Sequence, residues 1–302
     1  MRSLKLMKGL ICFLMFILGI VIAWSFVNRS FAEPRGYAPT PPPIFRTNEN
    51  DTSPHTPEEL LKDIIENHFQ TTNIDSYFDQ VNQEIFDGVV NNLKQIDIPF
   101  LKAIWHSRGR IVLTNGSLTN LESLASLRGQ ETCHDALHTC RSFDDINGLH
   151  RHNRAYKRIR PCEPTGNREF NNIEEVRTFC NVQSRIYLNS ATLFHEIGHL
   201  LDQSIALIEQ FGEISLRRIS DQESFQMIVE AEFDDLFRGL PGLTRYFSAS
   251  WEYAAESFAM FYGFSSTHQL RNQNILLERA PRTYSHFRYM LLNYDPRPTE
   301  RY

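Results

Sequence analysis

The sequence has no excess of positive charge. Its 31 lysine and arginine residues are outnumbered by 36 aspartate and glutamate residues, which gives a formal net charge of −5 at pH 7. Residues 1–32 hold four of the basic residues and no acidic one, so the chain beyond them has 27 basic residues (31 less 4), 36 acidic residues and a net charge of −9. Because nucleic-acid-binding domains usually carry a basic surface, this balance argues against a nucleic-acid partner.

Long apolar runs are scarce, and the sequence has no internal repeat. The one long uncharged stretch, Gly9–Trp24, follows three basic residues and precedes the small-residue pattern Ser30-Phe31-Ala32. This order is typical of an export signal. Sixteen apolar residues are longer than most signal cores and shorter than a comfortable membrane span, so cleavage after Ala32 and retention as a single membrane anchor both stay open. Either outcome places the rest of the chain outside the cytoplasm, secreted or periplasmic.

Cysteine is rare as well, with five residues in the chain and four beyond Ala32: Cys133, Cys140, Cys162 and Cys180. An even number of cysteines in an exported chain predicts two disulfides. The sequence does not choose between the three pairings, although Cys133–Cys140 and Cys162–Cys180 would each close a short loop. The alternative is a second zinc site built from Cys133, His134, His138 and Cys140.

The composition divides the remaining chain into a linker and a folded part. Residues 33–56 include Pro41-Pro42-Pro43 and many small polar residues, which cannot bury enough apolar area to fold, so we expect a disordered linker. Residues 57–302 are expected to form one domain. Within it we expect a helical part at 57–108 and the core of the domain at 109–302.

Local patterns predict several elements of this domain. Thr56–Glu59 has the hydroxyl, proline and acids of a helix start, and a second helix is expected from Ile74 towards Leu93. Arg110–Thr114 and Ser184–Leu188 are typical of strands, the second of which either runs along a cleft and pairs with a substrate backbone or lies inside the sheet. Asn189-Ser190 would then cap the next helix.

A basic run lies between the two expected strands. It consists of Arg151, Arg154, Lys157, Arg158 and Arg160. A run of this kind could bind an anionic partner. Since charge runs usually lie in solvent, we expect a solvated strand or loop instead.

The motif His195-Glu196-x-x-His199 carries the strongest chemical signal. On a helix the two histidines stand one turn apart on one face, so their ring nitrogens can converge on one zinc ion. Glu196, about 100° round the helix, would lie beside the metal. There it can take a proton from the water that zinc activates and later pass it to a leaving amine. Gly198 weakens a helix, which indicates a close neighbour on that side.

A catalytic zinc usually has a third protein ligand. Asp202 and Ile205 stand where an extended three-histidine motif would require other residues, so that class is excluded. Ser250–Tyr262 has a helical pattern with Glu252, Ala255, Glu256 and Ala259 on one stripe. We expect Glu252 to be the ligand and Glu256 to accept a hydrogen bond from a zinc histidine. Exchange of the two glutamate roles and a solvated acidic stripe are the alternatives.

These residues resemble the metallopeptidase domain of anthrax lethal factor and the related Pro-Pro endopeptidases. The resemblance rests on Phe194–Asp202 and Glu252–Phe258, with similar segments at Ile111–Gly116, Leu127–Gly129 and Phe143–Gly148. It implies a zincin fold of the gluzincin type, zinc held by His195, His199 and Glu252, and Glu196 as general base. Tyr246 is the nearest match to the family's tyrosine, which donates a hydrogen bond to the tetrahedral intermediate.

The sequence therefore predicts an α+β zincin-like metallopeptidase with a small twisted sheet, an active-site helix and a mostly helical carboxy-terminal part. We expect an exported endopeptidase that uses one Zn²⁺ per chain and acts on a protein or peptide substrate. Membrane contact is expected only through an uncleaved segment at residues 9–24. The alternatives are a catalytically silent zinc-binding module that engages a partner protein, and a membrane-tethered scaffold.

Overall fold

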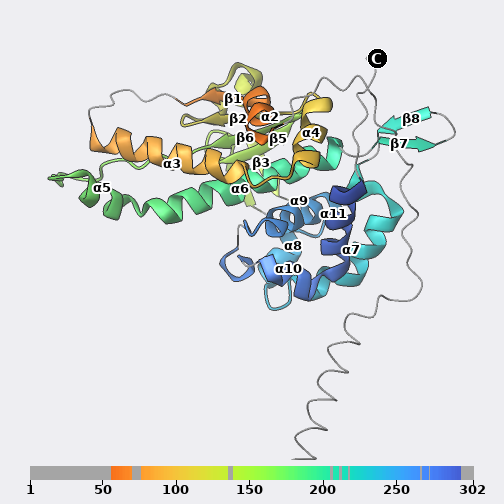
Figure 1. The fold of residues 1–302 in the computed structure, drawn as a ribbon. Coiled ribbons are helices and arrows are strands. Elements are labelled where there is room, and N and C mark those ends of the chain that lie inside the picture. Colours follow the sequence, from red (N-terminus) through yellow and green to blue (C-terminus); the bar gives the residue numbers. More distant parts are fainter. Residues whose placement is uncertain are drawn as a thin grey trace, which may run out of the picture. The chain divides into compact units, whose positions relative to one another are not determined.

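The computed structural model divides into two compact units, Met1–Pro42 and Pro43–Tyr302. It describes residues 56–69, 76–134, 139–204, 207–210, 213–216, 218–265, 267–271 and 273–293, all in the second unit (Figure 1). The expected export segment and nearly all of the expected linker lie outside the described residues. Within the described ranges, no helix combines the length and hydropathy that a bilayer crossing needs.

A four-stranded sheet with the order β1-β2-β6-β5 forms the middle of this unit. Its strands are β1 (Ile65–His68), β2 (Arg110–Thr114), β5 (Gly148–Arg151) and β6 (Arg154–Arg158). β2 runs parallel to β1 and β6, whereas β5 runs antiparallel to β6. The turn residues between β5 and β6, His152 and Asn153, both have positive φ angles, as a two-residue hairpin turn requires. β5 is therefore an edge strand.

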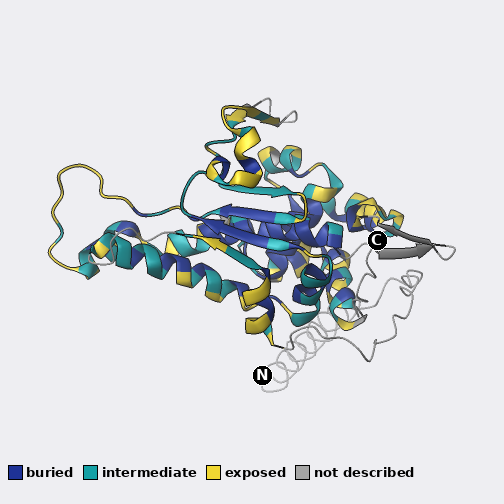
Figure 2. Cartoon of the chain, turned by 90° about the horizontal axis from the view of Figure 1, so that it is seen from above, coloured by how far each residue is buried: buried dark blue, intermediate teal, exposed yellow. Residues whose placement is uncertain are grey.

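Alternate residues of the sheet face two apolar cores, as the period of a strand demands. Ile111, Leu113 and Ala155 belong to the larger core, to which the helices contribute. Val112 and Tyr156 belong to a smaller core on the opposite face. Figure 2 shows the central strands as buried as the helix faces that cover them. The side of the strand on which a residue lies thus decides which elements it meets.

Helices from the first part of the domain pack into the larger core. They are α2 (Pro57–Ile64), α3 (Tyr77–Leu93), α4 (Ile98–His106), α5 (Ile173–Cys180) and α6 (Val182–Ser204). α2 begins with the predicted cap, since Thr56 and Glu59 exchange side-chain and backbone hydrogen bonds. The predictions of α2, α3 and β2 are confirmed. β1, however, lies within the part expected to be helical, and it joins that part to the sheet.

Short elements lie between β2 and β5: the 3₁₀ helices η1 (Leu118–Asn120) and η2 (Glu122–Leu127) and the hairpin of β3 (Glu131–His134) and β4 (Thr139–Ser142). The carboxy-terminal part is mostly helical. After the hairpin of β7 (Leu207–Gln210) and β8 (Glu213–Leu216) it has η4 (Ile219–Asp221), α7 (Glu223–Leu236), α8 (Pro241–Tyr246), α9 (Ser250–Phe261), η5 (His268–Leu270), α10 (Gln273–Arg279) and α11 (Pro281–Asn293). The fold is α+β with a small sheet, as predicted.

Helices α6 and α9 touch through their backbones. A Cβ atom on Gly198 of α6 would lie 2.6 Å from the Cα and 2.7 Å from the carbonyl oxygen of Ala255 in α9. Real Cβ atoms do not approach other atoms so closely, so only glycine allows this contact. The expectation that Gly198 has a close neighbour is confirmed, and the neighbour is the alanine-bearing helix.

The strand predicted at Ser184–Leu188 is wrong, because these residues lie inside α6. Short apolar runs do not distinguish a strand from a buried helix. Here Asn181 adopts the left-handed conformation that ends α5, and α6 begins directly after it. Asn189 and Ser190 are therefore not a cap. They are buried in mid-helix, where Asn189 accepts a hydrogen bond from the backbone of Arg160 and Ser190 from Asn92.

The basic run is only partly solvated. Arg154 and Arg158 are half-buried and Arg160 is exposed, but Lys157 keeps only 1% of its surface in solvent. The expectation of a solvated segment is wrong at Lys157. The cause is the alternation of β6, which turns Ala155 and Lys157 towards the larger core and Tyr156 towards the smaller one.

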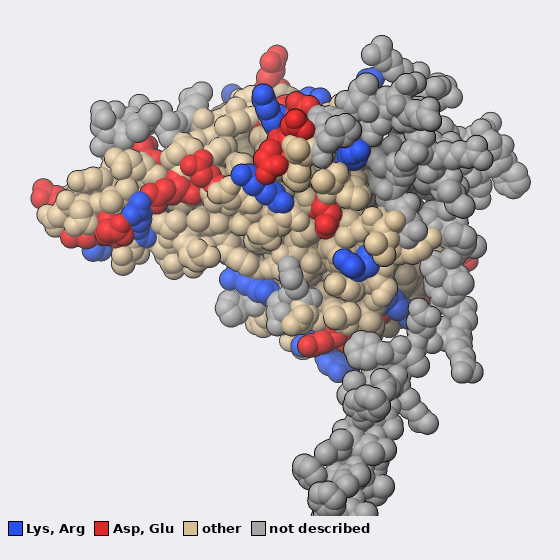
Figure 3. Space-filling view, in the orientation of Figure 1, with Lys and Arg blue, Asp and Glu red and all other residues tan. Residues whose placement is uncertain are grey.

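Charged side chains also connect elements at the surface. Acidic side chains gather over the α3–α5 end of the face shown in Figure 3. Glu84 of α3 and Glu174 of α5 both pair with Arg177. Arg177 thereby links two helices that lie side by side.

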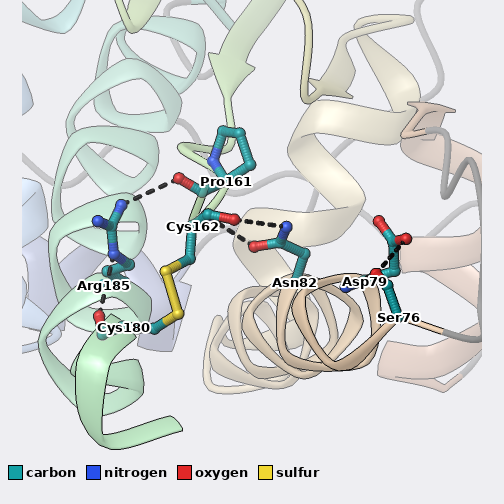
Figure 4. Close-up of a disulfide and its surroundings, with 7 residues drawn as sticks. All are labelled: Ser76, Asp79, Asn82, Pro161, Cys162, Cys180 and Arg185. Atoms are coloured by element: carbon teal, nitrogen blue, oxygen red, sulfur yellow. Dashed lines mark hydrogen bonds between the residues drawn. A yellow bond between two sulfur atoms is a disulfide. The ribbon is translucent and has the colours of Figure 1, made fainter. Parts of the chain in front are cut away.

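Both disulfides join the cysteines that the short-loop pairing suggests, Cys133–Cys140 and Cys162–Cys180. The first bridges β3 and β4, so its sulfurs are not thiolates and the alternative zinc site there is wrong; His138 of that site lies outside the described residues. The second ties the segment after β6 to the end of α5 (Figure 4). Beside it, Asn82 both donates to and accepts from the backbone of Cys162, and Arg185 donates to the carbonyls of Pro161 and Cys180.

We expect Gly198→Ala to lower the free energy of unfolding by about 2 kcal/mol, because the added methyl group must push α6 and α9 apart. The control is Gly242→Ala in α8. Its Cβ would meet nothing within 4 Å, so its effect should be near zero. Denaturant unfolding of both variants checks this, and a Gly198→Ala protein as stable as the wild type would contradict it.

The two disulfides should contribute unequally to stability. Cys162–Cys180 closes a loop with a sequence separation of 18, and both residues are buried, so replacing both by serine should cost about 3 kcal/mol. Cys133–Cys140 has a separation of 7 and lies in an exposed hairpin, so the matched double serine variant should cost less. Denaturant unfolding under oxidising conditions gives both values, and equal losses would contradict this assignment.

Candidate metal centre

His195 and His199 lie on one face of α6, one turn apart. Their ring centroids are 4.8 Å apart and the rings are nearly perpendicular, at 88°. Both side chains are largely buried, with 10% and 14% of their surfaces exposed. The two Nε2 atoms converge, as the spacing of the motif predicts.

Glu252 meets these nitrogens from α9. Its Oε2 atom lies 3.2 Å from the Nε2 atom of His195 and 3.5 Å from that of His199. One ligand atom from each of the three residues falls within 4.8 Å of the other two. The structure thus brings together the three residues that the sequence singles out as ligands.

The group has the chemistry of a metal site. The Oε2 atom of Glu252 is buried and receives no well-aligned hydrogen bond from any described residue. Leaving a buried carboxylate oxygen without a partner is costly, so an atom of this kind indicates a missing partner. Two imidazole nitrogens and one carboxylate oxygen with room for a fourth ligand is a donor set that zinc favours. The residues present therefore fit a metal ion.

Glu256 lies on the far side of His195. One of its carboxylate oxygens is 3.1 Å from the Nδ1 atom of His195, and the other accepts a hydrogen bond of 2.7 Å from the Ser265 hydroxyl. Glu256 is fully buried. A proton on Nδ1 that points to this carboxylate leaves the lone pair of Nε2 facing Glu252, which is how such a partner orients a metal-binding histidine.

The carboxylates also set the protonation of this cluster. Burial by itself lowers the pKa of His195, but the adjacent carboxylates of Glu252 and Glu256 outweigh burial and raise it to about 10. Burial raises the pKa of Glu252, yet the close approach of the His195 and His199 rings holds it well below its usual range. The acids therefore create a negative potential at the Nε2 atoms. A potential that retains a proton there also favours a cation.

Glu196 is 8% exposed and lies next to His195 on α6. Burial raises its pKa, and the charges of His195 and His199 oppose that rise. Tyr246 lies at the end of α8, partly buried. Burial raises its pKa, and the charges of Glu252 and Glu196 raise it further, so its hydroxyl remains protonated. The next residue, Phe247, packs against the ring of His195 at 6.0 Å.

Three residues of the site were not expected from the sequence. Ser265 holds Glu256, and Ser220 donates two hydrogen bonds of 2.8 Å to buried Asp202 at the end of α6. His150 of β5 lies with its ring 6.0 Å from that of His199. Burial, followed by the nearby charge of His199, lowers the pKa of His150 to about 4. None of the three had a sequence signal of its own, although Asp202, which Ser220 contacts, ends the segment Phe194–Asp202 that carries the family resemblance.

Comparisons with known proteins give one family match. No curated protein matches the chain. The solved structure of the Pro-Pro endopeptidase PPEP-2 from Paenibacillus alvei is similar over 76% of this chain and 99% of its own, with 18% sequence identity and a TM-score of 0.49. The family model described as anthrax toxin lethal factor, N- and C-terminal domain, matches residues 55–290. That match and the group of His195, His199 and Glu252 indicate a metal-dependent endopeptidase type of protein. Since the match spans most of the sequence, the chain belongs to the anthrax toxin lethal factor family.

Proposed function

We propose that this protein is an exported zinc endopeptidase that hydrolyses peptide bonds with Glu196 as general base. One observation carries the proposal: His195, His199 and Glu252 converge around a buried carboxylate oxygen that no described residue satisfies. Glu196 lies beside them on α6, where a catalytic carboxylate is needed.

His195, His199 and Glu252 would hold one zinc ion per chain, with Glu256 fixing the ring of His195. Zinc bound there would supply a Lewis acid that lowers the pKa of a water molecule and polarises the peptide carbonyl. Glu196 would take the proton of the attacking water and deliver it to the leaving amine. Burial raises its pKa, which favours acceptance of that proton.

Tyr246 would stabilise the developing oxyanion. Its phenol stays protonated beside Glu252 and Glu196, so it has a hydrogen to donate when negative charge forms on the substrate oxygen. Phe247 packs against His195 and stacks on Phe237, which holds this end of α8 next to the ligands. Tyr246→Phe would remove only the hydroxyl that donates this hydrogen bond and would therefore test the role of Tyr246.

The substrate would be a protein or peptide bound in an extended form. β5 pairs only with β6 among the described strands, so its other edge offers backbone groups to a peptide. Two residues of β5, Gly148 and His150, lie against Glu196 and His199. A peptide added to this edge would therefore run past the proposed metal site.

Export rests on the leader pattern in residues 1–32 and on the disulfides. Two disulfides among four cysteines are typical of an oxidising compartment outside the cytoplasm. We propose residues 57–302 as the peptidase domain, 33–56 as its linker, and residues 9–24 as the only membrane contact when the leader is retained.

Glu196→Gln should keep the metal and lower kcat about 10²–10⁴-fold, because glutamine has the same shape and cannot take a proton. The matched control is Glu223→Gln, an exposed glutamate at the start of α7, which should leave kcat and metal content unchanged. Glu252→Gln should instead lose bound zinc. Elemental analysis and cleavage of a peptide library, with and without a chelator, measure both properties.

Activity in this assay should disappear with the chelator and return with added zinc. Full activity of Glu196→Gln would contradict its role as base. A protein that binds zinc at these residues and cleaves no peptide would be the silent binding module instead.

A further inference from the structure

Lys157 is a buried cation that the proposed reaction does not use. Its side chain is 1% exposed, and its Nζ atom donates one hydrogen bond of 3.3 Å to the backbone oxygen of Asn147. A carbonyl oxygen does not neutralise an ammonium group, and an unpaired buried charge is strongly unfavourable. A carboxylate close to Lys157 would remove this cost.

The sheet places Lys157 opposite Gly148. The two residues are direct partners across β6 and β5, so they point to the same face of the sheet, about 5 Å apart at their Cβ positions. That face is the one on which Ala155 meets the larger core and His150 meets His199 of α6. Lys157 therefore points towards the helix that carries the metal ligands.

The side chains of Glu196 and Thr192 occupy the space that a side chain at position 148 would fill. A Cβ atom on Gly148 would lie 2.5 Å from the Oε1 atom of Glu196, 2.7 Å from the Cγ2 atom of Thr192 and 3.0 Å from the Cγ atom of Glu196. The residue opposite Lys157 is thus Gly148. The carboxylate of Glu196 lies where a side chain of that residue would be. Burial and the charge of Arg160 lower the pKa of Lys157, the charge of Glu196 opposes them, and the resulting pKa is about 7.

We propose that Lys157 is a positioning residue for Glu196: its buried charge attracts the carboxylate towards β5 at Gly148, across the strand pair and not through a direct ion pair. This role rests on the proposed function, in which Glu196 is the base. With Oε1 drawn towards the strand, the carboxylate would present its other oxygen in one preferred orientation. Gly148 completes the arrangement, since any side chain there would displace the carboxylate.

Lys157→Met tests the charge while keeping the length of the side chain. We expect kcat to fall about 10–100-fold, because a small displacement of a catalytic group has effects of this size, with KM and zinc content unchanged. Arg154→Gln is the matched control. Arg154 is on the same strand and faces away from α6 towards Glu66, so kcat should stay within about twofold of the wild type.

A thermal double-mutant cycle on the metal-free protein gives a readout that does not depend on activity. Glu196→Gln leaves the ammonium unpaired and Lys157→Met leaves the carboxylate unpaired, so each should lower the Tm. The double variant removes both charges and should lose clearly less than the sum of the two changes. Strictly additive changes in Tm would overturn the pairing, and an unchanged kcat in Lys157→Met would overturn its role in positioning.

Gly148→Ala adds bulk without changing charge, and it should lower kcat at least as far as Lys157→Met does. Gly116→Ala is the control, because its Cβ would meet neighbours at 3.6 and 3.8 Å, which is ordinary contact. A wild-type protein that cleaves no peptide overturns the proposed function and this role with it. An active wild type with additive Tm changes overturns the Lys157 proposal alone.

Discussion

The backbone contact between α6 and α9 is the constraint on which the rest of the site depends. Packed helices usually lie 8–10 Å apart, and the missing side chain of Gly198 allows these two to approach at the short end of such distances. His199 follows Gly198 directly, and Glu252 precedes Ala255 by less than one turn. A glutamate is short, so its carboxylate meets two imidazoles only when the helices are this close. The packing of α6 against α9 therefore sets the relative positions of the three candidate ligand atoms.

Buried hydrogen bonds then fix the orientation of what packing brings together. Ser265 holds Glu256, which in turn holds the ring of His195. Ser220 holds Asp202 one turn beyond His199. Ser265 follows α9 and Ser220 lies in η4, so the ring positions on α6 depend on how those two segments pack against it. Each of these acids is satisfied inside the protein, whereas the Oε2 atom of Glu252 is not, and that contrast separates supporting groups from a ligand.

Much of this arrangement could be predicted from local sequence, because helical spacing alone places His195, Glu196 and His199 together. Glu252 and Glu256 follow from the same reasoning, since small residues beside acids indicate a helix that approaches another closely. The start of α2, the course of α3 and β2, and the loop lengths of the disulfides are also local properties.

What could not be predicted depends on contacts between distant residues. Ser184–Leu188 has the composition of a strand, and only packing against α3 and the sheet makes it the first half of a long helix. Lys157 belongs to a basic run, and its burial follows from the side of β6 on which it lies. Cross-strand partners such as Gly148 and Lys157 are close in space for reasons that appear only when the register of the sheet is known.

Gly148 shows that an active site can be defined by volume that is kept empty of side chains. Glycine has no side chain that could carry charge, form a hydrogen bond or bind a metal. Its position nonetheless decides how near the edge strand lies to α6. In this fold the clearance between β5 and α6 is set by one hydrogen atom, and a larger residue at that point would displace either the strand or the carboxylate of Glu196.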